Sequence, residues 1–145
     1  MTDSRPVVEH QEGVPFELDA FVIRPEGDFD VAERARLLDA FAIAASSAAV
    51  VIDCRRTRYM DSTVLECLVA LQRALGARGG KLVLAEPSPE IRRIFDVCSL
   101  DRLLYIRGSL SEVMDELDAD PVRVRRLTLI AEPTDAVETD RSKLK

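Results

Sequence analysis

The chain has 145 residues, of which 47% are hydrophobic and 32% are charged, so it contains enough apolar material for one core and is not globally disordered. The net charge of -6 argues against nucleic acid or an anionic membrane as the default partner. No stretch approaches the roughly 20 apolar residues of a membrane-spanning helix, and the N-terminus has no apolar run. We therefore expect a cytoplasmic protein.

The residue types that most often carry catalysis are scarce. The only histidine is His10, in a polar N-terminal stretch, which argues against Ser-His-Asp and Cys-His nucleophiles and against histidine zinc sites. The three cysteines, Cys54, Cys67 and Cys98, lie far apart in apolar segments and are expected to be buried free thiols. The glycines at 76–80 lack the spacing of a phosphate-binding loop. We expect no catalytic residue, no metal, no cofactor and no enzymatic activity.

The first part of the chain is expected to hold a tail, one or two strands and a helix. Residues 1–13 are predicted to be a flexible N-terminal tail. Apolar positions at 14–18 and 21–23 predict two short strands or one bent strand, closed by a turn at 25–27. From Asp30 the apolar residues repeat with helical spacing. The predicted inward face of this helix consists of Val31, Ala35, Leu38, Phe41, Ala42 and Ala45.

Strands and helices then alternate. The continuous apolar run at 48–53 predicts a strand that is buried on both faces. A second helix is expected to begin at Ser62 or Thr63 and to stop at the glycines of 76–80, before a strand at 81–86. A third helix follows, with proline near its start and with Ile91, Ile94, Phe95 and Cys98 on its inward face. A strand at 103–106 and a fourth helix with Ser109 as its N-cap complete the pattern.

This order predicts one α/β domain over residues 14–117. Its sheet is expected to be mixed but mostly parallel, with about four to six strands and about four helices packed against it. Residues 118–145 are expected to form a C-terminal extension. Apolar positions at 122–130 predict an extra edge strand or an arm that meets another subunit in a homodimer. The remainder has the composition of a disordered tail.

The stretch Asp61-Ser62-Thr63 lies where a strand gives way to a helix. Ser or Thr at an N-cap accepts a hydrogen bond from an amide of the first helical turn, and Thr63 with Glu66 matches a capping box. An Asp beside a helix start is favoured by the helix dipole. The stretch is therefore either a helix-capping sequence or a site that a partner recognises and modifies.

Several motifs stand in order around this stretch. A strand ends in Asp53, the pair Tyr59-Met60 precedes Asp61-Ser62, and a leucine-rich helix follows. A glycine break then leads to "KLVLAE", "PSPEIRRIF" and "SLDRLLYI". Together these motifs resemble the STAS domain, as found in bacterial anti-sigma-factor antagonists, so the predicted fold is a single STAS-like domain over residues 14–117. Upstream, "PEGDFD" stands where that family has a turn before its first helix.

The resemblance implies a non-enzymatic regulatory domain, an anti-sigma-factor antagonist. In that family, the serine directly after the Asp is phosphorylated by a serine kinase that is also the anti-sigma factor, and a phosphatase resets the site. The matching residue is Ser62, with Thr63 as the alternative. Neither nucleic acid nor a membrane is an expected partner. The residues expected to bind the partner are Asp28, Asp61, Ser62, Thr63, Val64, Leu65 and Glu66.

Nearby arginines are open to more than one interpretation. Arg55, Arg56 and Arg58 are expected to form a solvated cluster, although they could also pair with Asp53 and Asp61 or hold a phosphate on Ser62.

The chain departs from the family pattern Asp-Ser-Ser-Gly-Leu-Gly. Val64 and Glu66 replace both glycines, and Ser99 replaces a common glycine before Leu100. Those glycines would let a partner backbone approach closely. Their loss favours a second hypothesis, in which the domain is a STAS-type scaffold or oligomerisation module without phosphorylation.

Overall fold

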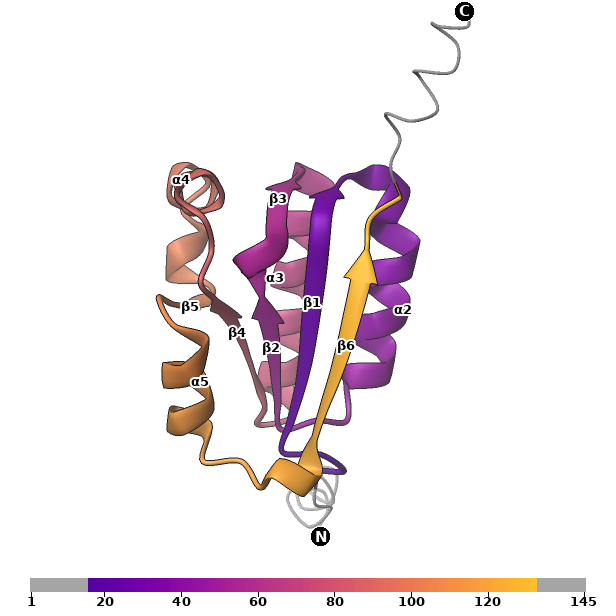
Figure 1. The fold of residues 1–145 in the computed structure, drawn as a ribbon, viewed down its shortest axis with the longest axis vertical. Helices are drawn as coiled ribbons and strands as arrows, with labels where there is room; N and C mark the ends of the chain where they lie inside the picture. Colours follow the sequence, from indigo (N-terminus) through magenta and orange to yellow (C-terminus); the bar gives the residue numbers. More distant parts are fainter. Residues whose placement is uncertain (1–15, 133–145) are drawn as a thin grey trace, which may run out of the picture.

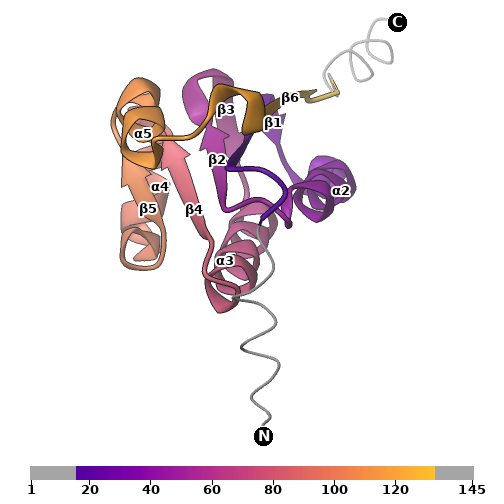
Figure 2. The same ribbon diagram turned by 90° about the horizontal axis from the view of Figure 1, so that it is seen from below.

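A computed structural model describes residues 16–132 as one sheet with helices on both faces (Figures 1 and 2). The six strands are β1 (Ala20–Phe29), β2 (Ala49–Asp53), β3 (Thr57–Met60), β4 (Lys81–Ala85), β5 (Tyr105–Arg107) and β6 (Val124–Ile130). The α-helices are α2 (Arg34–Ala44), α3 (Ser62–Ala77), α4 (Pro89–Val97) and α5 (Leu110–Leu117). Short 3-10 turns are η1 (Val31–Glu33), η2 (Cys54–Arg56), η3 (Leu100–Arg102) and η4 (Pro121–Arg123). None of these helices is long and apolar enough to cross a membrane.

Strand β1 pairs with three other strands, and every strand pairing among the described residues is parallel. β6 pairs with β1 along seven positions, from Ala20 opposite Val124 to Glu26 opposite Ile130. On its other side, β1 pairs first with β2 and then with β3, which continue one another with η2 between them (Figure 1). β4 and β5 extend the sheet beyond β2. The sequence-based prediction of a mostly parallel α/β fold is confirmed.

The two faces of the sheet carry separate apolar layers. Helices α2 and α3 cover one face and α5 covers the other (Figure 2). Within β2, Val50 and Ile52 pack with the larger layer under α2, α3 and α4, whereas Val51 packs with Val113 of α5. Alternate side chains of a strand point to opposite faces, so a strand buried on both sides must be apolar throughout. The apolar run at 48–53 therefore has the predicted environment.

Strand β1 does not turn at residues 25–27, contrary to the sequence-based prediction. The strand continues through Pro25, which pairs with Leu129, and bulges between Gly27 and Asp28. Pro25 lies between the positions of β1 that pair with β2 and those that pair with β3, and its carbonyl accepts a hydrogen bond from the Thr57 hydroxyl at 2.7 Å. Gly27 has φ +102, and an added Cβ would lie 3.2 Å from the Cβ of Ala131, so this bulge requires glycine.

The inward face of α2 also differs from the prediction. The buried residues are Leu37, Ala40, Phe41 and Ala44, so of the predicted face only Phe41 is buried. Val31 is 65% exposed. Apolar residues are adjacent at 37–38 and 40–45, so helical spacing fits two neighbouring faces of α2 equally well. Packing against the sheet and α3 decides which of the two faces is buried.

The cysteines have two environments. Cys54 and Cys67 are buried, as expected, and burial raises the pKa of the Cys54 thiol. Cys98 is exposed, so the prediction of a third buried thiol was wrong. Helix α4 ends at Val97, and Cys98 stands at its C-cap, where the chain leaves the core.

Candidate functional site at the start of α3

Asp61 joins β3 to α3 at the carboxyl end of the sheet. Its backbone amide donates a hydrogen bond to the carbonyl of Phe29, the last residue of β1, at 3.1 Å. The predicted site stretch therefore lies beside the end of β1, which also carries Asp28. In this way the parallel sheet brings Asp28 and the Asp61 stretch, separated along the chain, to the same edge of the molecule.

Asp61 is the N-cap of α3. Its Oδ1 accepts hydrogen bonds from the amides of Thr63 at 3.0 Å and Val64 at 3.1 Å, and from the Thr63 hydroxyl at 2.6 Å. This arrangement differs from the predicted cap at Ser62 or Thr63 with Glu66. Asp61 has an extended backbone, with φ -90 and ψ 178, and Ser62 is already the first helical residue. The carboxylate of Asp61 therefore reaches the unpaired amides first.

The same hydrogen bonds set the charge state of Asp61. Partial burial opposes ionisation, but the Thr63 hydroxyl and the amides of Val64 and Thr63 outweigh it and hold the pKa of the carboxyl below its usual value. A negative charge is therefore present at the start of α3 at neutral pH.

Ser62 and Thr63 are not equivalent. Ser62 is exposed, and its hydroxyl makes no hydrogen bond with any residue from 16 to 132. The Thr63 hydroxyl is partly buried and donates to Asp61. Only the Ser62 oxygen is thus both accessible to a partner and unused by the fold.

The two residues that replace the family glycines have different positions. Val64 is fully buried and packs with the main core, so its side chain does not project into solvent at the start of α3. Glu66 is exposed one turn further along α3. Leu65, predicted to bind a partner, is mostly buried but reaches the surface at a groove beside the helix start.

This groove was not anticipated from the sequence. It has a volume of about 370 Å³, begins at Ser62, and runs along α3 past Leu65 and Val69 to Leu100 and Leu103. We call it the apolar groove. Leu103 is 49% exposed, although the sequence pattern had placed it in a strand. The groove lies between α3 and the segment 98–103, and a local pattern in the sequence cannot predict that these two segments meet.

The nearby arginines pair with acids other than Asp61. Arg55 and Arg24 both bind the buried carboxylate of Asp53, at 2.8 Å and 3.1 Å. Burial opposes ionisation of Asp53, but its hydrogen bonds from these arginines keep its pKa below the usual value. Arg58 pairs with Asp28 at 3.2 Å on the surface. Asp28 is therefore at the predicted edge, held by Arg58.

These features define a parallel α/β domain whose exposed helix start carries a free serine next to an apolar groove. The family model described as "Mlab, STAS domain" matches residues 12–105. The chain belongs to the STAS domain family.

Two relatives share this sequence pattern. A STAS-domain containing protein of Pseudomonas aeruginosa is 31% identical over 85 residues, which cover 58% of this chain and 84% of that protein. A Thermotoga maritima protein named as an anti-sigma factor antagonist is 29% identical over 58 residues, covering 40% of this chain and 51% of that protein.

Solved structures share the fold. The anti-sigma factor antagonist SpoIIAA in its unphosphorylated form has a TM-score of 0.57 at 22% identity, over 72% of this chain and 93% of that one. A sulfate transporter family protein from Wolinella succinogenes has a TM-score of 0.62 at 15% identity, over 74% of this chain and 91% of that one. At these identities the likeness is one of fold.

Proposed function

We propose that the protein is a non-enzymatic regulatory domain, an anti-sigma-factor antagonist, which binds its partner through the start of α3 and is switched off by phosphorylation of Ser62. The partner is an anti-sigma factor with serine kinase activity, and a cognate phosphatase restores the serine. The unmodified protein sequesters the anti-sigma factor in the cytoplasm and so releases the sigma factor. The Thermotoga relative and the SpoIIAA fold support this class of function.

The observation that carries the proposal is the free hydroxyl of Ser62. Because Asp61 caps α3, the fold does not need the Ser62 oxygen, and a kinase could modify it without breaking an internal hydrogen bond. Thr63 is a poorer acceptor of phosphate because its hydroxyl is committed to Asp61. The neighbouring apolar groove offers a surface on which a partner could bury leucine side chains.

Charge and position explain how phosphate would act. A phosphoserine adds about -1.5 to -2 charges at neutral pH. The amides at a helix start tolerate an anion, so the fold is expected to remain intact. A partner docked against Ser62 would instead meet added charge and bulk beside Asp61 and at the mouth of the apolar groove. The switch would therefore act on binding and leave folding unchanged.

Binding measurements with substituted proteins test this proposal. We expect Ser62→Ala to bind the anti-sigma factor as the natural protein does, and Ser62→Asp to bind at least about tenfold more weakly, which corresponds to roughly 1.4 kcal/mol. Isothermal titration calorimetry with the purified anti-sigma factor from the same organism measures both. Ser111→Asp is the matched control, because Ser111 is an exposed serine in the first turn of α5 and an acid there should leave binding unchanged.

Mass spectrometry after incubation with the kinase and ATP identifies the modified residue. Phosphate on Ser62 alone would support the proposal. Equal affinities of Ser62→Ala and Ser62→Asp, or phosphate on Thr63 alone, would refute it.

A further inference from the structure

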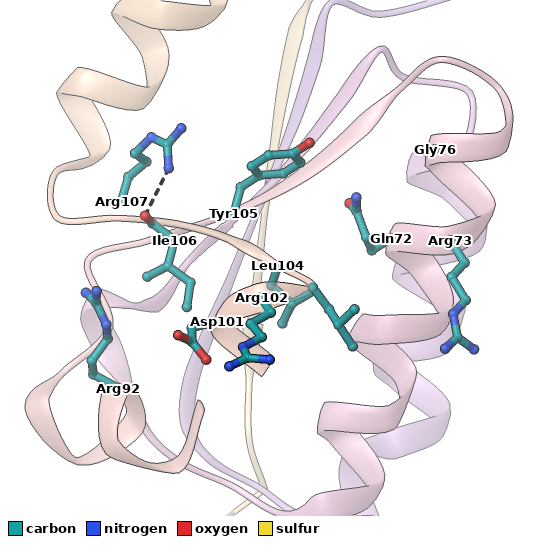
Figure 3. A pocket seen from close by; sticks show the side chains of 11 residues that line it. Gln72, Arg73, Gly76, Arg92, Asp101, Arg102, Leu104, Tyr105, Ile106 and Arg107 are labelled. Carbon is teal, nitrogen blue, oxygen red and sulfur yellow. Dashed lines mark hydrogen bonds between the residues drawn. The ribbon is translucent and has the colours of Figure 1, made fainter. Parts of the chain in front are cut away.

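A second hollow adjoins the apolar groove at the β5 edge of the sheet. It has a volume of about 690 Å³ and is lined by Arg73, Arg92, Arg102 and Arg107, with Tyr105 between them (Figure 3). We call it the arginine groove. Arg73 also lines the apolar groove, so the two hollows form one continuous surface.

The charge of the arginine groove is unusual for this protein. Four guanidinium groups come from four elements, α3, α4, η3 and β5, and only one carboxylate, that of Asp101, lines the hollow with them. Arg107 pairs with Glu116 at 3.4 Å, and Arg73, Arg92 and Arg102 form no ion pair with residues 16–132. In a chain of net charge -6, this gathering of like charges makes a locally positive surface that attracts an anionic partner.

The groove also contains the outer edge of β5, where the carbonyl of Ile106 accepts a hydrogen bond from the Arg107 guanidinium at 3.1 Å (Figure 3). Within the described part of the chain, β5 pairs with β4 alone, so the outer side of its backbone has no strand beside it. Figure 3 shows Arg92 and Arg73 at opposite ends of the hollow, with Tyr105 and Ile106 of β5 between them. An exposed strand edge can accept an extended peptide as an additional strand.

We infer that the arginine groove binds an extended acidic segment of a partner protein. The segment pairs with the outer edge of β5 and displaces the Arg107 guanidinium from the Ile106 carbonyl. Its carboxylates meet Arg92, Arg102 and the released Arg107 in charge-assisted hydrogen bonds. A protein is favoured over a nucleic acid because the groove continues into the leucine-lined apolar groove and because the whole chain is acidic. This inference goes beyond the proposed switch and does not require phosphorylation of Ser62.

A fluorescent peptide of about ten residues that alternates Glu and Thr is a suitable probe, because alternate residues of an added strand face the same side. We expect saturable binding by fluorescence anisotropy, and a loss of at least about tenfold in the Arg92→Glu/Arg102→Glu protein. Arg93→Glu is the matched control, because Arg93 is an exposed neighbour on α4 that does not line the groove. The neutral Arg92→Gln/Arg102→Gln protein should show a smaller loss of peptide affinity. It serves as a second test in case the charge-reversed protein does not fold.

Amide chemical shifts in NMR spectra locate the bound peptide. The inference predicts that the amides of Tyr105, Ile106 and Arg107 shift on binding, and that Ser62→Asp leaves peptide affinity unchanged. Failure of the switch at Ser62 would therefore leave this result intact. No saturable binding, unchanged affinity in the double variants, equal binding of a Lys-Thr peptide, or tighter binding of a single-stranded oligonucleotide would each overturn the inference.

Discussion

Three neighbouring polar side chains at the start of α3 have three different environments. Asp61 accepts the hydrogen bonds of the helix start, Thr63 donates its hydroxyl to Asp61, and Ser62 points to solvent. The capping role of Asp61 is what leaves Ser62 available to a partner. The residue that stabilises the helix and the residue proposed as the switch are therefore different, so modification of one need not disturb the other.

Substitution of Asp61 tests the capping role. Asp61→Ala should lower the free energy of unfolding by about 1 kcal/mol, whereas Asp61→Asn, which can still cap, should cost only a few tenths. Since the pKa of Asp61 is lower in the folded than in the unfolded state, its charge stabilises the fold above the unfolded pKa of about 3.9, and this contribution is lost as the pH falls through the folded pKa.

Urea denaturation at about pH 7 and about pH 3 measures these differences. The advantage of the natural protein over Asp61→Asn should shrink at the lower pH. An advantage that is the same at both pH values would show that the carboxylate charge contributes nothing.

At the scale of elements, α2 and the end of β6 are joined by a buried acid. Glu33 is 2% exposed, and its carboxylate accepts hydrogen bonds from Arg36 and from the amide of Glu132, both at 2.7 Å. Arg36 also donates to the carbonyl of Ile130 at 2.8 Å. We call this group the Glu33 clamp. The clamp connects the end of β6 to the start of α2.

Removal of the carboxylate should loosen this junction. We expect Glu33→Ala to lower the free energy of unfolding by about 1–3 kcal/mol, because two hydrogen bonds to a buried carboxyl group are lost. Hydrogen exchange should show reduced protection at Leu129 and Ile130. Asp39→Ala is the control, because Asp39 is an exposed acid on α2, the helix that Glu33 precedes, and it should change stability by about 0.5 kcal/mol or less. Equal effects of the two substitutions would exclude a structural role for the clamp.

At the scale of the whole molecule, β6 is an edge strand of the sheet beside β1, as one of the two sequence-based alternatives predicted. It pairs with β1 along seven positions and adds Leu127 and Leu129 to the main core. The residues predicted as an extension beyond 117 therefore contribute to the same core as residues 20–117. A homodimer through this segment stays a prediction.

Shortening the chain tests how far the folding unit extends. A protein that ends at Arg123 loses β6 and exposes one edge of β1, and burial of Leu129 alone is worth about 1.5–3 kcal/mol. We expect this protein to unfold at a clearly lower temperature or to aggregate. A protein that ends at Glu132 keeps β6 and should melt as the full chain does, by circular dichroism. Equal melting of the two shortened proteins would place the folding unit before β6.

Some elements could be predicted from local patterns because their environment is uniform. The apolar run of β2 is buried on both faces. Helix α5 has Ser109 as its N-cap, and the Ser109 hydroxyl accepts a hydrogen bond from the amide of Glu112 at 3.2 Å. Ser99, noted where the family commonly has glycine, does adopt a left-handed backbone with φ 59. In each case the residues that predict the feature lie within a few positions of it in the sequence.

Other features were decided by tertiary contacts. Pro25 falls where β1 passes from β2 to β3, and its carbonyl is bound by Thr57. The buried Glu33 accepts a hydrogen bond from a residue 99 positions away in the chain. The apolar and arginine grooves arise where separate elements meet. The sequence by itself determined the alternation of strands and helices and the position of the Asp61-Ser62 junction, because periodicity and polar breaks are local. Only the tertiary structure decided which side chain caps α3 and which hydroxyl remains free, since that outcome depends on the backbone path by which β3 enters the helix.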